Sequence, residues 1–127
     1  MTIRHMSDIV RDQRPLTLSP ATTVKHACEA MRERRVGAVL VTEHDRLVGI
    51  FTGRDAVCRV LAEGKDPAHT RLREVMTQAP KTMPPGKSAV EALQMMADCG
   101  CRHIPVVEGE KLVGIVARHD IIKMLGL

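Results

Sequence analysis

Aromatic side chains are almost absent from this sequence. Its 127 residues include one Phe, at position 51, and no Trp or Tyr. Proteins that hold single-stranded nucleic acid stack the bases on aromatic rings, so this scarcity argues against such a partner. Charge of one sign is not concentrated either: the formal net charge is +4, and no run of five like charges occurs. The composition therefore disfavours nucleic acid and favours a solvated surface with a local anion site.

Long apolar runs are also missing. No stretch approaches the roughly 20 apolar residues that a membrane-spanning helix needs, and the N-terminal MTIRHMSD lacks the apolar core of a secretory signal. We therefore expect a cytoplasmic protein with no membrane partner. Hydrophobic residues make up 44% of the chain and charged residues 27%, a balance typical of a globular domain of ordinary size.

Cysteine is sparse, with four in the chain. Cys28, Cys58 and Cys101 fall at apolar positions of the pattern, where small buried thiols are common. The CGC of residues 99–101 has no second Cys or His pair at metal-ligand spacing. We expect no metal site, and we expect the CGC to have no chemical role.

The sequence repeats itself when it is shifted by 65 residues, and no gap is needed. LVGI at 47–50 falls on LVGI at 112–115, and Asp55 falls on Asp120. The proline-bounded PLTLSP at 15–20 falls on PKTMPP at 80–85. Such self-similarity predicts two copies of one structural unit in a single compact body.

Each copy begins with a short extended piece and a helix. In the first copy the residues at i, i+3, i+4 and i+7 of the helix are apolar and share one face: Val24, Ala27, Cys28 and Met31. The second copy repeats this face: Ala89, Ala92, Leu93 and Met96. Ser88 and Glu91 have the spacing of a capping box, and Gly100 is a suitable end for this second helix.

A strand hairpin and a second helix complete each copy. The strands are expected at 36–42 and 47–51, and again at 101–107 and 112–116. Apolar positions of the second helix are Val57, Val60 and Leu61 in the first copy and Ile121, Ile122 and Leu125 in the second. Two helices cover only one face of so small a sheet, so we expect the other face to pack on the other copy.

The turn from the second strand to the second helix differs between the copies. It reads GIFTGRD at 49–55 and GIVARHD at 114–120. Thr52 suits a helix N-cap, and a carboxylate at Asp55 can accept hydrogen bonds from a ribose diol while the helix N-terminus faces a phosphate. The same T-x-x-D is also a capping box, which needs no ligand. The second copy has Ala117 at the position of Thr52, and this residue has no hydroxyl to cap the helix or to donate a hydrogen bond to a ligand.

These features resemble a tandem pair of CBS domains, the module named after cystathionine β-synthase. The double LVGI, the RHIPVV strand at 102–107 and the two strand-to-helix turns carry the resemblance. It implies an α+β fold of the CBS type, with β-α-β-β-α repeats at 6–64 and 71–127 packed sheet to sheet about a pseudo-twofold axis. It also implies a regulatory Bateman module that senses AMP, ADP, ATP, NAD or S-adenosylmethionine, needs no cofactor, forms a homodimer and signals to an unknown protein in trans.

The resemblance further implies two crossed ligand sites. Site A, the favoured one, takes its residues from the turn of copy one and the first strands of copy two: Ile50, Thr52, Arg54, Asp55, Thr82, Met83, Lys87, Cys101, Arg102 and His103. Site B reverses the copies: Thr17, Thr22, Val36, Gly37, Arg118, His119 and Asp120. Site B lacks the hydroxyl of Thr52 and has Gly37 and Ala38 where site A has Arg102 and His103, so we expect it to bind more weakly.

Two other functions compete with ligand sensing. The pair could serve as an oligomerisation platform whose ligand sites are degenerate. An enzyme is disfavoured, because the sequence contains no G-x-S-x-G, H-E-x-x-H or Walker motif.

Overall fold

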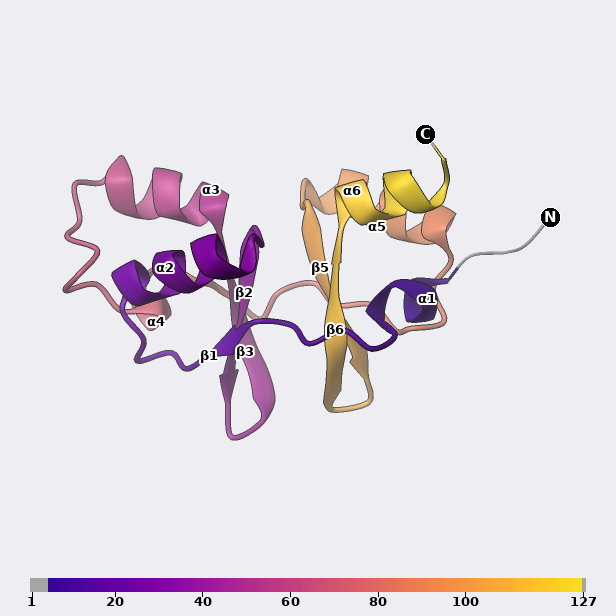
Figure 1. The fold of residues 1–127 in the computed structure, drawn as a ribbon, viewed down its shortest axis with the longest axis horizontal. Coiled ribbons are helices and arrows are strands. Elements are labelled where there is room, and N and C mark those ends of the chain that lie inside the picture. Colours follow the sequence, from indigo (N-terminus) through magenta and orange to yellow (C-terminus); the bar gives the residue numbers. More distant parts are fainter. Residues whose placement is uncertain (1–4, 127) are drawn as a thin grey trace. The chain divides into compact units, whose positions relative to one another are not determined.

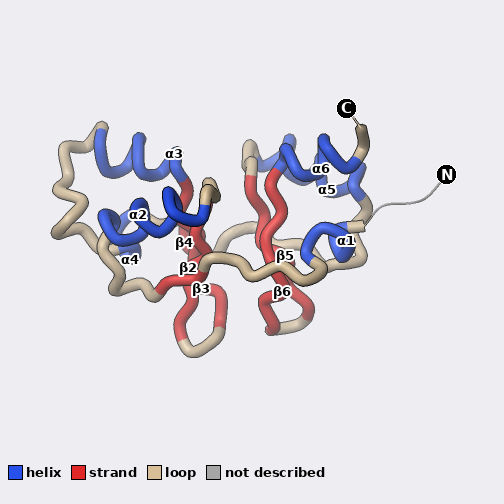
Figure 2. The backbone as a smooth tube through the Cα atoms, in the orientation of Figure 1, coloured by secondary structure: helices blue, strands red, loops and turns tan. Residues whose placement is uncertain are grey.

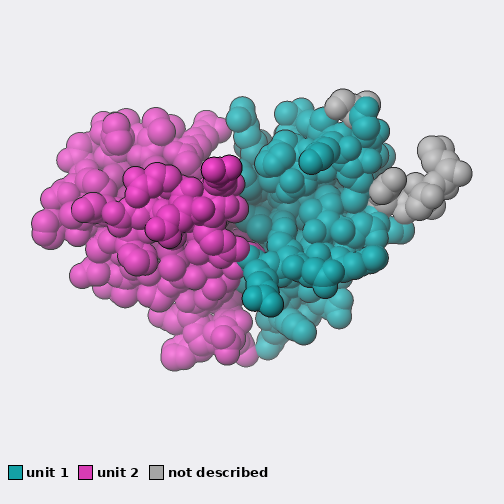
Figure 3. All heavy atoms as spheres, viewed as in Figure 1, with its two compact units in different colours: residues 1–14, 81–127 teal, residues 15–80 magenta. Residues whose placement is uncertain are grey.

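The computed structural model describes residues 5–126, and positions 1–4 and 127 lie outside the described residues. The described chain divides into two compact units (Figure 3). Unit 2 is residues 15–80, and unit 1 combines the described parts of 1–14 and 81–127. Among the described residues, no helix has the length and apolarity to cross a membrane.

Unit 2 holds a four-stranded sheet in the order β1-β2-β3-β4 (Figure 1). Its elements are β1 (Thr17–Leu18), α2 (Val24–Arg34), β2 (Ala38–Glu43), β3 (Arg46–Thr52), α3 (Gly53–Asp55), the π-helical η1 (Ala56–Leu61), α4 (Leu72–Val75) and β4 (Thr77–Gln78). β1 runs parallel to β2, and β2 and β3 form an antiparallel hairpin. Two residues with positive φ, His44 and Asp45, form its tight turn.

Unit 1 repeats this plan with a smaller sheet. Its elements are α1 (Met6–Val10), α5 (Ala89–Cys99), β5 (His103–Glu108), β6 (Lys111–Ala117) and α6 (Arg118–Met124). β5 and β6 form the antiparallel hairpin, seen as a pair of red strands in Figure 2. The extended piece predicted at 80–85 makes a single parallel bridge, from Met83 to Val106.

The core of each unit lies between its hairpin and its helices. In unit 2 the buried cluster comprises Val24, Ala27, Met31, Val39, Val41, Phe51, Val60, Leu72 and Val75. In unit 1 it comprises Met6, Val10, Met83, Ala89, Ala92, Met96, Ile104, Val106, Val116 and Ile121. The apolar faces predicted for the first helix of each copy are thus confirmed, with Cys28 and Leu93 at their partly buried edges.

Helix ends follow the predicted capping pattern. Glu91 N donates to Ser88 Oγ (3.2 Å), and Ser88 N donates to Glu91 Oε1 (3.3 Å), which is the predicted capping box of α5. Gly100 ends the helix with φ of 68°, a left-handed conformation that favours glycine.

The segment that opens each predicted repeat packs with the rest of the other repeat. α1 opens the predicted first repeat, yet Met6 and Val10 belong to the core of unit 1. α4 opens the predicted second repeat, yet it contributes to the core of unit 2, and β4 pairs with β3. The units therefore cut across the predicted repeats 6–64 and 71–127. We call residues 5–13 and 71–78 the lead-in segments.

The prediction for the helix after the first hairpin was partly wrong. Val60 is buried, but Val57 is 60% exposed and Leu61 is 76% exposed. Val60 and the half-buried Ala56, four residues apart, face the core, and Val57 and Leu61, also four residues apart, lie on the solvent-facing side next to them. In α6, Ile121 is buried as expected and Leu125, just beyond the helix end, is exposed.

Candidate functional site

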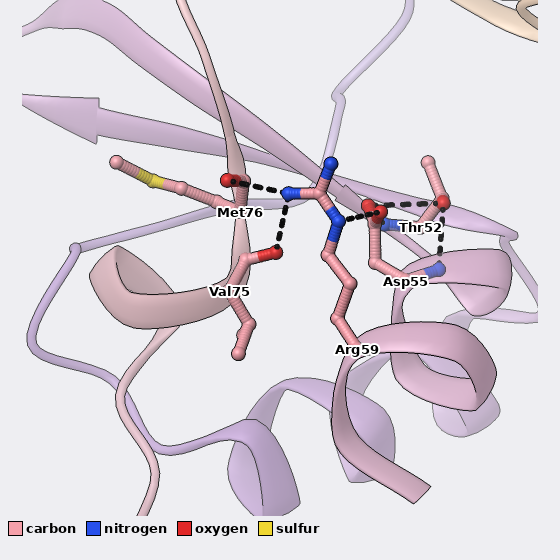
Figure 4. A network of polar contacts seen from close by, with 5 residues as sticks. All are labelled: Thr52, Asp55, Arg59, Val75 and Met76. Carbon is pink, nitrogen blue, oxygen red and sulfur yellow. Dashed lines mark hydrogen bonds and ion pairs between the residues drawn. The ribbon is translucent and has the colours of Figure 1, made fainter. Parts of the chain in front are cut away.

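The strand-to-helix turn of unit 2 holds the Asp55 carboxylate tightly (Figure 4). Thr52 N donates to Asp55 Oδ2 at 2.9 Å, and the Thr52 hydroxyl donates to the same oxygen at 3.1 Å. Asp55 N in turn donates to Thr52 Oγ1 at 3.3 Å. The capping box that the sequence allowed is therefore present.

Arg59 completes this network from η1. Its Nε lies 3.5 Å from Asp55 Oδ1. Its Nη1 donates to the carbonyls of Val75 and Met76, at 3.3 and 3.2 Å. Arg59 thus joins the Asp55 turn to the lead-in segment at the end of α4, as Figure 4 shows. Arg59 was not among the residues predicted for the site, although its i+4 spacing from Asp55 on a helix is a usable signal.

The Asp55 carboxylate keeps limited capacity for a ligand. A carboxylate offers about four acceptor positions, and Thr52 N, the Thr52 hydroxyl and Arg59 use three of them. The side chain is only 13% exposed. Because the hydroxyl proton of Thr52 can rotate to another acceptor, a cap and a ligand contact are compatible at this turn.

The equivalent turn of unit 1 is more open. Ala117 N donates to Asp120 Oδ2 at 3.2 Å, and His119 Nε2 lies 3.2 Å from Asp120 Oδ1. The Asp120 side chain is 38% exposed. Ala117 is the N-cap residue and makes no side-chain cap bond. The missing hydroxyl therefore leaves the Asp120 carboxylate with more free acceptor positions than Asp55 has.

Basic side chains gather at this end of unit 1. His103 lies opposite Ala117 in the hairpin, and Arg118 N donates to Arg102 O at 2.8 Å. The pKa of His103 is lowered, first because burial desolvates the ring and then because His119 repels the protonated form; Asp120 opposes this effect and Arg102 adds to it. We call Arg102, His103, Arg118 and His119 the basic cluster. With one carboxylate, that of Asp120, beside it, this cluster suits a phosphate group.

The structure groups the predicted site residues by unit. Unit 2 contains Thr17, Thr22, Val36, Gly37, Ile50, Thr52, Arg54 and Asp55, and Gly53 N donates to Gly37 O at 3.1 Å. Unit 1 contains Thr82, Met83, Lys87, Cys101, Arg102, His103, Arg118, His119 and Asp120. Arg102 and His103 of site A thus lie beside Arg118 and Asp120 of site B. Each composite site draws on both units and stays a prediction.

Burial separates the apolar candidates from the polar ones. Met83 and Ile50 are buried, and Met83 belongs to the core of unit 1. Arg54, Thr82, Arg102 and Arg118 are exposed. The polar candidates are therefore accessible to a ligand, whereas Met83 is held in place by its neighbours.

Two cysteine predictions were wrong. Cys99 and Cys101 are joined by a disulfide, so the expectation that the CGC of residues 99–101 has no chemical role is wrong. Cys58, on η1, is exposed rather than buried. Cys28 is half-buried as a free thiol, and burial raises its pKa. The described residues hold no group of three or more His, Cys, Asp or Glu placed to bind a metal.

Comparisons with known proteins agree with this architecture. The model of the CBS domain family matches residues 6–61 and 72–127. The CBS domain-containing protein CBSCBSPB2 of Arabidopsis thaliana is 42% identical over 117 residues, which cover 91% of this chain and 21% of that protein. Another curated relative, from Methanopyrus kandleri, is matched over 57% of its length. The chain thus spans a fifth to somewhat over half of these relatives.

Solved structures show the same fold. The CBS domain pair of protein MJ0100, in complex with 5′-methylthioadenosine and S-adenosyl-L-methionine, has a TM-score of 0.87 and 25% identity, covering 98% of each chain. A hexameric CBS-CP12 protein from bloom-forming cyanobacteria has a TM-score of 0.87 and 26% identity, covering 96% of this chain and 72% of that one. The fold and its turns define a tandem pair of the mixed α+β class. The chain belongs to the CBS domain family.

Proposed function

We propose that the chain is a non-catalytic regulatory module that binds an adenosine-containing ligand: AMP, ADP, ATP, NAD or S-adenosylmethionine. One observation carries the proposal. Two strand-to-helix turns at equivalent positions each orient an aspartate, Asp55 or Asp120, through a backbone N–H, with acceptor positions left over for ribose hydroxyls. The adenosine ligands bound to the pair of MJ0100 support this ligand class.

The preferred site combines the Thr52–Asp55 turn with Arg102 and His103. Thr52 supplies a hydroxyl that Ala117 lacks, and the basic cluster of unit 1 supplies positive charge for a phosphate. Binding an anion beside His103 favours its protonated form, because the anion offsets the repulsion from His119. Binding of a phosphorylated ligand is therefore expected to be accompanied by proton uptake at His103.

Titration calorimetry with the five ligands tests this site. Asp55→Asn keeps the size of the side chain and removes its charge, and should weaken binding by about tenfold to a hundredfold. Asp120→Asn should weaken it less. Asp45→Asn is the matched control: Asp45 lies exposed in the β2–β3 turn at φ of 63°, a conformation that Asn adopts readily.

The two possible failures are distinct. If Asp120→Asn abolishes binding and Asp55→Asn leaves it intact, the preference for Asp55 is wrong. If none of the five ligands binds the unsubstituted protein, the sensing function itself is wrong.

The alternative function is a ligand-independent oligomerisation platform. Val57 and Leu61 favour it, because both are exposed on η1 and offer an apolar surface to a second copy. We propose a homodimer in either case, with a regulated protein bound in trans in the sensing case. A ligand present at about 100 times its Kd stabilises a protein by roughly 2.7 kcal/mol. A melting temperature that no ligand raises, together with a dimer that Leu61→Ser dissociates, would favour the platform.

A further inference from the structure

The disulfide of unit 1 lies where α5 gives way to β5. Cys99 is the last residue of α5, Gly100 is its left-handed cap, and Cys101 stands two residues before His103. Cys101 N donates to Met96 O at 3.0 Å, and Cys99 Sγ lies 3.8 Å from the same carbonyl oxygen. The bond therefore fixes one helix-to-strand turn.

This disulfide is poorly placed to act as a global staple. Cross-links stabilise a fold mainly by closing long loops of the unfolded chain. Cys99 and Cys101 are only two residues apart, so the bond closes one of the shortest loops possible. Its effect is local, on the conformation of Gly100 and of the residues that follow.

A cleft of about 480 Å³ opens beside Cys99. Small-molecule sites have volumes of a few hundred to a thousand Å³. Two lysines, Lys81 and Lys87, line the cleft together with Glu91 and Asp98. Lys87 Nζ lies 3.5 Å from Glu91 Oε2, whereas Lys81 has no ion-pair partner among residues 5–126. The carboxylate of Asp98 accepts a hydrogen bond from Gln94 Nε2 at 2.9 Å, and the ammonium group of Lys81 is the cation that the cleft offers to an acidic molecule beside the Cys99 sulfur.

We propose that Cys99 and Cys101 form a reversible dithiol–disulfide couple, reduced by a small anionic thiol of the glutathione class that enters this cleft. The thiolate of one molecule attacks Cys99 Sγ, the Cys99–Cys101 bond breaks, and Cys101 leaves as a thiolate that takes a proton from water. A second thiol attacks the mixed disulfide, releases Cys99 and forms the oxidised dimer of the small thiol. Two thiols supply the two electrons, and the reverse reaction restores the protein disulfide.

The redox state then acts on the basic cluster. Arg102 and His103 directly follow Cys101, and reduction frees the turn that positions them. A binding group that must be ordered by the ligand costs affinity, so the reduced protein should bind a phosphorylated adenosine about two- to tenfold more weakly. This consequence rests on the proposed function, whereas the couple itself does not.

Mass spectrometry of the full chain tests the couple. A Cys28→Ala, Cys58→Ser background leaves only the proposed pair. The protein is equilibrated with mixtures of reduced and oxidised glutathione, denatured in acid and alkylated. We expect a single transition from no label to two labels per chain. Two labels at every ratio, or one label at any plateau, would overturn the proposal.

The rate of reduction tests the cleft. Lys81→Gln should slow reduction by glutathione about two- to fivefold, the range of an exposed charge pair. It should slow reduction by 2-mercaptoethanol less, because the attacking thiolate of 2-mercaptoethanol carries a single negative charge and that of glutathione carries additional carboxylates. Lys111→Gln, a lysine at the far end of β6 from Ala117, is the matched control and should change neither rate. Equal slowing with both thiols, or no slowing with glutathione, would refute a role for the cleft.

Calorimetry with ATP on the oxidised and reduced background protein tests the coupling. Amide hydrogen exchange at residues 100–103 is measured beside it and should accelerate on reduction. Faster exchange with unchanged affinity refutes the coupling alone. If neither form binds ATP or any of the other four ligands, the sensing function fails, while the mass transition and the exchange rates still decide the couple.

Discussion

A methyl group at Gly114 should displace the lead-in segment 5–13 from β6. Gly114 is buried in β6, and a Cβ there would lie 2.5 Å from Gln13 Oε1 and 2.8 Å from Val10 Cγ1. Gln13 binds the next residue of the strand twice: its Nε2 donates to Ile115 O at 2.9 Å, and Ile115 N donates to its Oε1 at 2.6 Å. Gly114→Ala cannot be accommodated without moving both side chains.

The expected cost follows from these contacts. Overpacking costs about 1–3 kcal/mol, and each hydrogen bond lost adds about 0.5–1.5 kcal/mol. If the lead-in segment moves partly away from β6, the overpacking is relieved but the hydrogen bonds of Gln13 are lost, so the two costs do not add in full. We therefore expect Gly114→Ala to lower the free energy of unfolding by about 2–4 kcal/mol. With a urea m-value of about 2 kcal/mol/M, the midpoint should fall by about 1–2 M.

The assay is urea unfolding followed by far-ultraviolet circular dichroism, because the chain has no Trp or Tyr for fluorescence. Gly86→Ala is the matched control: it lies in the same unit, and a Cβ there meets no atom within 4 Å. Gln13→Ala should be destabilising alone and should cost less in the Gly114→Ala background, since the two share one contact. If Gly114→Ala and Gly86→Ala unfold within about 0.5 kcal/mol of each other, the packing of the lead-in segment on β6 is refuted.

Three further predictions concern helix caps and pH. Ser88→Ala should lower the free energy of unfolding by about 1 kcal/mol in urea titrations, because it removes the N-cap of α5. Ala117→Thr should raise that energy by about 0.5–2 kcal/mol by restoring the cap that Thr52 makes in unit 2, and an unchanged midpoint would contradict this reasoning. His103 should make stability fall as pH drops below its ordinary pKa of 6.5, since the unfolded chain takes up the proton first. Urea midpoints measured at pH 7.5 and 5.5 for the unsubstituted protein and for His103→Gln check the direction of this effect. If the midpoint changes equally with pH in both proteins, His103 is excluded as the cause.

The internal register explains why much of the fold was predictable. A shift of 65 residues without a gap imposes the same order of elements on both halves, so a feature seen clearly in one copy supports its counterpart in the other. The capping boxes of Ser88 with Glu91 and of Thr52 with Asp55 were also readable, because they depend only on residues three apart.

Other features depend on information that local pattern does not contain. The register cannot say which copy a lead-in segment packs on, since α1 and α4 are equivalent by sequence. The apolar spacing of the helix after the first hairpin does not reveal that Val57 and Leu61 face solvent while Val60 is buried. The Cys99–Cys101 bond needs the left-handed Gly100 between the two residues. The tight Arg59 contact depends on where α4 ends in space rather than in sequence.

The exchange of lead-in segments has a consequence for how such a chain can be shortened. Residues 15–80 form a continuous stretch that carries its own α4 and β4, whereas 81–127 lacks the helix and the Gln13 side chain that complete its hairpin. A protein consisting of one repeat with its own lead-in would leave that surface for another molecule to fill. The same exchange carried out between two such molecules is a domain swap, and duplication of the repeat turns the swapped dimer into a single covalent chain.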